Sequence, residues 1–243
     1  MHGKFADLPK RIATILALAI ICIPAVILRD SQPILFAIAV LAIAALSMVE
    51  AVKLYRTALY AAVTPWSSTT HRLKSNSHEA FSIVTAEYVL GVTALLLYDR
   101  SIIWLIIISA CAYDVFALLT GKLLGGMFFT KRPCPILSPT KTWEGCIGGW
   151  FFSIVLSFAY LLLFTDFGLY PENLPNIALA VTGCFIAFFG DLSGSHLKRL
   201  AKVKDSGNLL PGHGGCLDRF VSLYAVAAYY LFLYLPLYLY HFA

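Results

Sequence analysis

The sequence predicts an all-α polytopic membrane protein, with about seven transmembrane helices and one interfacial helix on the cytoplasmic side. Hydrophobic residues make up 60% of the 243-residue chain, and the mean hydropathy is +0.80. Charged residues make up only 13%, whereas a soluble domain carries about 25%. The length suits one bundle of several spans, so we expect a single integral-membrane domain over residues 1–243.

Seven apolar segments are expected to cross the bilayer, which takes about 20 helical residues each. The chain begins much like a signal peptide, but the apolar run behind it is long enough to span, so we expect a first transmembrane helix there. The polar stretch Lys53–Ser77 is expected to be a loop. In order, the expected spans are about Ile12–Leu28, Pro33–Val52, Glu79–Leu97, Ile102–Leu119, Cys146–Phe164, Asn176–Phe189 and Leu217–Tyr240.

The basic residues are distributed unevenly over the two sides that seven spans define. The N-terminus, the stretch Lys53–Ser77, the loop Gly121–Gly145 and the stretch Gly190–Ser222 share one side. Of the 18 Lys and Arg residues, all but Arg29 and Arg100 fall on it. Under the positive-inside rule this side is cytoplasmic. We therefore expect a multi-pass protein of the inner (cytoplasmic) membrane, with its N-terminus and both polar loops facing the cytoplasm.

The stretch Gly190–Ser222 holds three aspartates and five basic residues between two strongly apolar segments. Asp191 ends the sixth span and Asp218 begins the seventh. Intramembrane carboxylates need a partner, and two at one site suit Mg²⁺, which prefers oxygen ligands. Structural ion pairs with nearby Lys or Arg are the alternative. Glu87 and Asp114 also fall within spans and raise the same question.

Four polar side chains follow one another at helical spacing in this stretch: Ser195, Lys198, Arg199 and Lys202. If Leu192–Val203 is helical, they line one face of an interfacial helix. Such a face attracts anionic headgroups or binds substrate phosphates. The pattern alone leaves both open, and the neighbouring aspartates and glycines favour phosphate binding.

Two short loops add further candidates. Pro211-Gly212-His213-Gly214-Gly215 lies just before the seventh span, where backbone N–H groups and a helix N-terminus suit a phosphate. A plain turn with a locally hydrogen-bonded histidine is the alternative. The loop Ser138–Gly145, with sequence SPTKTWEG, offers hydroxyls, a lysine and a carboxylate, while Trp143 suits either stacking or interface anchoring.

These motifs together resemble one family. Ser195–Arg219, SHLKRLAKVKDSGNLLPGHGGCLDR, is similar to the signature of the phosphatidate cytidylyltransferases, also called CDP-diacylglycerol synthases. The resemblance extends to SPTKTWEG, to Gly190-Asp191-Leu192 and, more weakly, to Asp114 with Gly121. It covers about the C-terminal half: residues 111–243 carry the motifs, whereas residues 1–110 are mostly generic spans.

The resemblance implies a metal-dependent enzyme that makes CDP-diacylglycerol and pyrophosphate from CTP and phosphatidic acid. It implies that Asp191 and Asp218 bind Mg²⁺, and it leaves open whether a second cation binds and whether the protein forms a homodimer. The implied partners are the two substrates and the lipid bilayer, and no nucleic acid is expected to bind. The implied catalytic residues are Asp191, Lys198, Arg199, His213 and Asp218. The implied substrate-binding residues are Asp114, Ser138, Lys141, Thr142, Glu144, Ser195, Lys204, Asp205, Gly214, Gly215 and Arg219.

The chain departs from the family pattern at two positions. Val221 stands where the signature has a second, metal-binding aspartate, and Thr140 stands where a lysine is usual. Valine has no ligand oxygen, so the chain is a weakened enzyme, an inactive relative or a variant with rearranged metal ligation. A catalytically weakened or inactive relative that binds lipid or a partner is the alternative function. A transporter would explain the intramembrane carboxylates but leaves the long phosphate-type signature unexplained.

Overall fold

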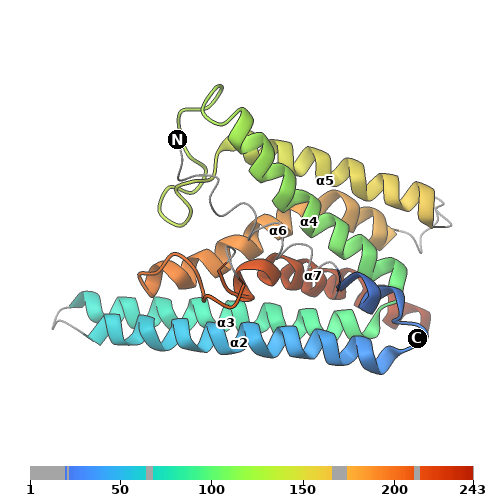
Figure 1. The fold of residues 1–243 in the computed structure, drawn as a ribbon, viewed down its shortest axis with the longest axis horizontal. Helices are drawn as coiled ribbons and strands as arrows, with labels where there is room; N and C mark the ends of the chain where they lie inside the picture. The colour runs from blue at the N-terminus through green and yellow to red at the C-terminus, as the bar shows by residue number, and fades with distance from the viewer. Residues whose placement is uncertain (1–19, 21, 64–67, 166–173, 211–213, 243) are drawn as a thin grey trace.

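The computed structural model describes residues 20, 22–63, 68–165, 174–210 and 214–242, and long helices dominate this part of the chain (Figure 1). Residues 22–27 form a short helical stretch, and His213 and most of the predicted first span lie outside the described residues. The long helices are α2 (Pro33–Val63), α3 (Ser68–Leu97), α4 (Arg100–Leu123), α5 (Trp143–Phe164), α6 (Leu174–Leu200) and α7 (Leu217–Phe242).

Five of these helices are long and apolar enough to cross a membrane, which confirms the predicted polytopic helical class. Their mean hydropathy lies between 1.7 and 2.5 and their length matches the hydrocarbon thickness. The α7 helix has 26 residues and agrees closely with the predicted last span. The membrane-crossing segments are Pro33–Ala61, Ser75–Leu97, Arg100–Leu123, Trp143–Phe164 and Asn176–Leu200.

Consecutive helices run in opposite directions, so alternate connections meet at the same end of the bundle (Figure 1). The α2–α3 pair and the α4–α5 pair form two edges, and α6 and α7 pack between them. The connections α4–α5 and α6–α7 both lie at the left end in Figure 1, as expected. Arg29 and Arg100 both pair with Asp30, in the connection that precedes α2, at 3.4 and 3.3 Å.

Glycines let α7 approach its neighbours closely. A methyl group built on Gly91 of α3 would lie 2.5 Å from the backbone oxygen of Tyr224, and one on Gly190 of α6 would lie 2.5 Å from Ala225 Cβ. Backbones in such close contact bury small side chains and gain dispersion energy, as is common between membrane helices. This packing fixes α7 between α3 and α6, and with it the start of α7.

Two sequence predictions about element boundaries are wrong. The stretch Lys53–Ser77 is largely helical, because α2 continues to Val63 and α3 begins at Ser68. Hydropathy marks the part of a helix that lies in lipid, whereas the helix itself can continue into the polar region. The predicted separate interfacial helix Leu192–Val203 is also absent, since α6 runs without a break to Leu200 and carries that segment as its last turns.

Candidate functional site

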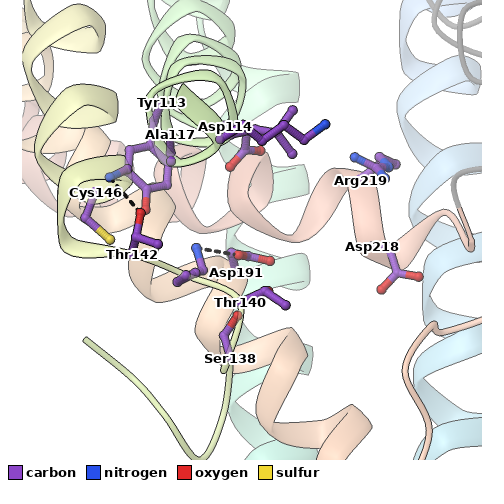
Figure 2. Close-up of a pocket in the computed structure, with 15 residues that line it drawn as sticks. Tyr113, Asp114, Ala117, Ser138, Thr140, Thr142, Cys146, Asp191, Asp218 and Arg219 are labelled. Atoms are coloured by element: carbon purple, nitrogen blue, oxygen red, sulfur yellow. Dashed lines mark hydrogen bonds and ion pairs between the residues drawn. The ribbon is translucent and has the colours of Figure 1, made fainter. Parts of the chain in front are cut away.

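A polar pocket of about 380 Å³ lies where the two polar connections meet (Figure 2). The last turns of α4, the loop before α5, the first turn of α5, the middle of α6 and the first turn of α7 line it. The site residues predicted from sequence that line it are Asp114, Ser138, Lys141, Thr142, Asp191, Asp218 and Arg219. The helical bundle thus brings together side chains that are up to 105 positions apart in sequence.

Lys141 and Asp191 form the ion pair on one wall of the pocket. Lys141 Nζ lies 2.7 Å from Asp191 Oδ2, and it also lies over the rings of Tyr113 and Phe188, 5.5 and 5.0 Å from their centroids. Burial lowers the pKa of the Lys141 ammonium, but the Asp191 carboxylate more than offsets this, so the pKa lies above its ordinary value. The Lys141 side chain is therefore a fixed positive charge at neutral pH.

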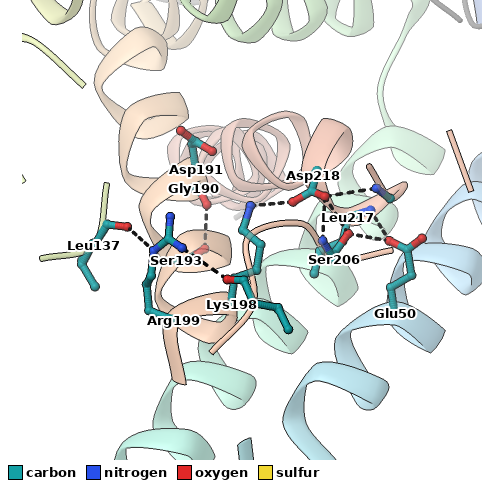
Figure 3. A network of polar contacts seen from close by, with 12 residues as sticks. Glu50, Leu137, Gly190, Asp191, Ser193, Lys198, Arg199, Ser206, Leu217 and Asp218 are labelled. Atoms are coloured by element: carbon teal, nitrogen blue, oxygen red, sulfur yellow. Dashed lines mark hydrogen bonds and ion pairs between the residues drawn. The ribbon is translucent and has the colours of Figure 1, made fainter. Parts of the chain in front are cut away.

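Asp218 lies on the opposite side and is held by four donor contacts (Figure 3). Its Oδ1 pairs with Lys198 Nζ at 2.5 Å. Its Oδ2 accepts from the backbone N–H of Ser206 at 2.8 Å and of Gly215 at 3.1 Å, and lies 3.0 Å from the Ser206 hydroxyl. A carboxylate offers about four lone-pair sites. Three of these contacts are on Oδ2 and one is on Oδ1, so most of the acceptor sites of Asp218 are occupied, although it lines the pocket.

Asp114 supplies a third carboxylate, from α4. Its Oδ2 accepts a hydrogen bond from the Ser222 hydroxyl at 2.9 Å, and the side chain faces the pocket in Figure 2. Within the described part of the chain, no group of three His, Cys, Asp or Glu side chains is arranged to hold a metal ion by itself. A cation here would therefore take further ligands from water or substrate, which is the habit of Mg²⁺.

Lys198 and Arg199 do not share a phosphate-binding face. Lys198 turns toward Asp218 in α7, whereas Arg199 Nε donates to the carbonyl oxygen of Leu137 at 3.1 Å (Figure 3). Adjacent helical residues point about 100° apart, because a turn takes 3.6 residues. Arg199 thus supports the loop that carries Ser138, and Lys202 lies beyond the end of α6.

Several other predicted residues lie around the pocket and not in its lining. Ser195 is buried in α6, while Lys204 and Asp205 are exposed after its end. Gly214 has a φ of +83°, a backbone conformation that favours glycine. Their roles in substrate binding stay predictions, as does that of His213, which lies outside the described residues.

Thr142 and Glu144 organise the start of α5. The Thr142 hydroxyl accepts from the N–H of Gly145 at 3.0 Å, so Thr142 is the N-cap of the helix. Glu144 Oε1 accepts from three backbone N–H groups, those of Gly126, Phe128 and Phe129, at 2.9 to 3.0 Å. Glu144 therefore holds the loop after α4 in place.

Some residues at or beside the site were not found from the sequence. Tyr113, Lys122 and Cys146 line the pocket as well, and no motif pointed to them. Glu50 of α2 was missed as well. Its Oε2 accepts from the N–H of Leu217, the first residue of α7, at 3.0 Å. That N–H, expected to be open for a phosphate, is therefore occupied by a carboxylate.

Val221 faces away from the pocket lining. Its side chain is 2% exposed, and a methyl group built on Gly194 of α6 would lie 3.3 Å from it. The valine thus packs in the α6–α7 interface, where an apolar side chain needs no hydrogen-bond partner. The adjacent Ser222 turns to Asp114 instead.

The fold and pocket define an integral-membrane protein with a charged site at one end of a helical bundle, and sequence comparison then places it. Residues 63–237, more than half of the chain, match the model of the cytidylyltransferase family. The chain belongs to this family.

Individual relatives of the chain support its assignment to this family. The chain is 38% identical over 141 residues to the phosphatidate cytidylyltransferase of Rickettsia bellii, which covers 54% of this chain and 57% of the relative. It is 39% identical over 122 residues to that of Haemophilus influenzae, covering 49% and 42%. It is 38% identical over 135 residues to phosphatidate cytidylyltransferase 4, chloroplastic, of Arabidopsis thaliana, covering 55% and 30%. The match thus spans about half or less of the length of these relatives.

Proposed function

We propose that the chain is a CTP:phosphatidate cytidylyltransferase, which makes CDP-diacylglycerol and pyrophosphate from CTP and phosphatidic acid. The observation that carries the proposal is the pocket in which Lys141, Asp191, Asp218 and Arg219 meet. Membership of the cytidylyltransferase family and the names of the relatives support it. The pocket belongs to a bundle of apolar helices, as a site that acts on a membrane lipid requires.

The chemistry needs no protein nucleophile. An oxygen of the lipid phosphate attacks the α-phosphorus of CTP, a P–O bond forms, the bond to the β-phosphate oxygen breaks, and pyrophosphate leaves. Positioning and charge neutralisation supply most of the catalysis in such transfers. We assign the neutralising role to Lys141 and Arg219, which line the pocket, and hydrogen bonding to the hydroxyls of Ser138 and Thr140.

We propose that Mg²⁺ is held by Asp191 together with Asp114. Of the two aspartates first expected to bind it, Asp191 uses one oxygen for Lys141, whereas both oxygens of Asp218 are in contact with donors of Lys198, Ser206 and Gly215. The ion pair of Asp191 and the hydrogen bond of Asp114 to Ser222 each involve one oxygen, Oδ2, and both aspartates line the pocket. Oxygen donors of this kind fit Mg²⁺ with water and phosphate completing its shell. Bound Mg²⁺ would supply positive charge to the phosphate oxygens.

The direct test uses the full chain in phosphatidylcholine nanodiscs with CTP labelled at the α-phosphate. With phosphatidic acid and Mg²⁺, we expect label in an organic-soluble product and one pyrophosphate per product. Replacing phosphatidic acid with diacylglycerol, which lacks the phosphate, should abolish the product. Adding excess EDTA should do the same, and adding Mg²⁺ back should restore it.

Val221 favours a second candidate, a family member that binds lipid and nucleotide without turnover. CTP binding by the wild-type chain without product formation would support it. Val221→Asp then separates two causes. A large gain of activity means that only a carboxylate is missing, whereas the active-enzyme proposal expects no gain, because residue 221 is buried against Gly194.

We propose that the pocket faces the cytoplasm of the inner membrane, where CTP is made available. All Lys and Arg residues except Arg29 and Arg100 fall on that side of the seven-span topology. A Lys131→Cys variant, with the six native cysteines replaced, tests the orientation. An impermeant maleimide should label it in inside-out vesicles but not in intact spheroplasts, and the reverse result contradicts the proposal.

A further inference from the structure

Glu50 is a buried carboxylate in the middle of a largely apolar helix, and it is the one acidic residue of that helix. It lies in α2, 7% exposed, within the membrane-crossing segment Pro33–Ala61. Its Oε2 accepts from the Ser206 hydroxyl at 2.8 Å and from the Leu217 N–H at 3.0 Å (Figure 3). Both donors are neutral groups, one in the α6–α7 connection and one at the first residue of α7, and both lie more than 150 positions further along the chain.

Contacts with the N-terminus of α7 offset part of the large free-energy cost of burying the charge of Glu50. An unpaired carboxylate in an apolar helix is strongly unfavourable and marks a functional position by default. Leu217 is the first residue of α7, and the first N–H groups of a helix have no partner within it. Glu50 therefore caps α7 from another helix, and its negative charge lies at the positive end of the α7 dipole.

Two glycines of the connection leave room for the Glu50 carboxylate. A methyl group built on Gly215 would lie 2.1 Å from Glu50 Oε2 and 2.1 Å from the Ser206 hydroxyl. One on Gly207 would lie 2.7 Å from Glu50 Oε1. Neither glycine has a positive φ, so their backbone conformation is open to other residues. Glycine is needed because a larger side chain would collide with the Glu50 carboxylate. The connection is thus shaped around the side chain of Glu50.

Ser206 contacts both Glu50 and Asp218. Ser206 contacts Asp218 Oδ2 through its N–H at 2.8 Å and its hydroxyl at 3.0 Å. The single hydroxyl proton of Ser206 can be donated to only one of the two carboxylates at a time, while its N–H donates to Asp218, so Ser206 lies between the two carboxylates and close to both. Moving Ser206 or the start of α7 would move Asp218 and the adjacent Arg219, which line the pocket.

We infer that Glu50 is a positioning residue for the reaction, acting through Ser206 and the N-terminus of α7 on Asp218 and Arg219. Its kinetic consequences rest on the proposed cytidylyltransferase function, whereas its structural consequences do not. Glu50 lies outside residues 63–237, which the family model matches. The site therefore depends on a carboxylate from the half of the chain that carries no recognisable motif.

The kinetic test compares Glu50→Ala and Glu50→Gln with Glu87→Gln. Glu87 is a matched control, because it is a glutamate in α3 that accepts from the hydroxyl of Ser193 at 2.7 Å. Misplacement of a reacting group by 1 Å can cost about 100-fold in rate, so we expect Glu50→Ala to lower kcat about 100-fold. Glu50→Gln keeps an acceptor oxygen and should recover most of that loss. The KM for CTP should change little in every variant, and so should kcat for Glu87→Gln.

Hydrogen–deuterium exchange supplies a readout that does not depend on activity. In Glu50→Ala and Ser206→Ala, amides of residues 205–210 and 214–217 should exchange at least tenfold faster, since the loss of one buried charged hydrogen bond has an effect on the order of this size. Amides of α5 should keep their wild-type rates. If wild type forms no CDP-diacylglycerol, the proposed function fails, and exchange alone decides the role of Glu50.

Three results would overturn the inference. The first is unchanged exchange of residues 205–210 and 214–217 in both Glu50→Ala and Ser206→Ala. The second is faster exchange throughout the bundle, including α5, which would make Glu50 a general stabilising residue. The third, in an active enzyme, is a Glu50→Ala variant with wild-type kcat. Because Glu50→Gln and Ser206→Ala are conservative, they keep the test decisive if Glu50→Ala does not fold.

Discussion

Asp191 and Asp218 line the same pocket and come from the same motif-rich half of the chain, but their surroundings differ. Asp191 makes one ion pair, with Lys141, and its side chain is 31% exposed. Asp218 has four donor contacts and its side chain is 7% exposed. The first carboxylate is open to a ligand, whereas the second is part of the framework that shapes the loop before α7. A shared motif therefore does not imply a shared role.

The two lysines differ in the same way. Lys141 comes from a loop and lies over two aromatic rings beside the pocket. Lys198 comes from α6 and is not among the residues that line the pocket. Loss of one partner from a buried pair leaves an uncompensated charge, whereas a partly exposed pair is partly solvated. Substitutions at the two aspartates should therefore separate stability from activity.

The largest effect is expected for Asp218→Asn. It leaves the Lys198 ammonium without its partner, and breaking a buried pair costs about 3–5 kcal/mol. We expect a large drop in the thermal unfolding midpoint in detergent and loss of CDP-diacylglycerol formation. The double variant Asp218→Asn/Lys198→Met should regain much of the stability without the activity. An unchanged midpoint for Asp218→Asn would show that Asp218 is not a framework residue.

Asp191→Asn should abolish activity while leaving the fold intact. Loss of one preorganised charge at a phosphoryl site lowers the turnover rate by a factor on the order of 10²–10³, whereas a partly exposed ion pair contributes about 1 kcal/mol or less to stability. The measurement pairs the turnover rate with the unfolding midpoint. Asp30→Asn is the matched control, since Asp30 also forms exposed ion pairs, at the other end of the bundle. Activity near wild type in Asp191→Asn would remove Asp191 from the site.

The sequence predicts the fold well because lipid imposes a simple rule. Apolar segments of sufficient length must be helical in a bilayer, so composition alone indicates a polytopic bundle. Helix ends are less predictable, because hydropathy changes at the lipid boundary and not where a helix stops. The continuation of α2 to Val63 and the merging of the basic segment Leu192–Leu200 into α6 both follow from this difference.

The sequence also predicts which residues approach the pocket better than what each of them does. Asp191 and Asp218 appear alike in the motif, and only their packing shows that the Asp218 side chain is the more buried of the two. Glu50 was missed because one glutamate near the end of an apolar run looks like the boundary of a span. Its partners Ser206 and Leu217 are brought to it by the tertiary fold, which a single sequence does not reveal.

A smaller effect is expected for a substitution of Arg199, which contacts the loop that carries Lys141. Arg199 is exposed and donates to the Leu137 carbonyl, one residue before Ser138. Arg199→Gln should loosen this loop and raise the KM for CTP about three- to tenfold with kcat nearly unchanged, the pattern of lost uniform binding. Steady-state kinetics at varied CTP measures it, with exposed Lys131→Gln as the control. If the turnover rate instead fell about 100-fold, Arg199 would be a catalytic residue, as the motif predicts.

The smallest effect is expected for Glu144→Gln, which tests whether a motif carboxylate beside Lys141 binds substrate or organises a loop. Glu144 Oε1 accepts three backbone N–H groups of the loop after α4, and the residue is not among those that line the pocket. Glutamine keeps an acceptor oxygen at that place but loses the charge. We therefore expect the KM for CTP to change less than about threefold, since charge-assisted hydrogen bonds weaken without being lost.

Exchange of the amides of Gly126, Phe128 and Phe129 distinguishes the two roles of Glu144. In Glu144→Gln these amides should exchange faster than in wild type, while residues 205–210 and 214–217 on the Asp218 side should be unaffected, because the two loops have separate anchors. A tenfold or larger rise in the KM for CTP with unchanged amide exchange would mean that the carboxylate contacts the nucleotide. In that case the carboxylate of Glu144 would bind substrate together with Lys141. Only the carboxylates of Glu50 and Asp218 would then serve to hold a loop in place.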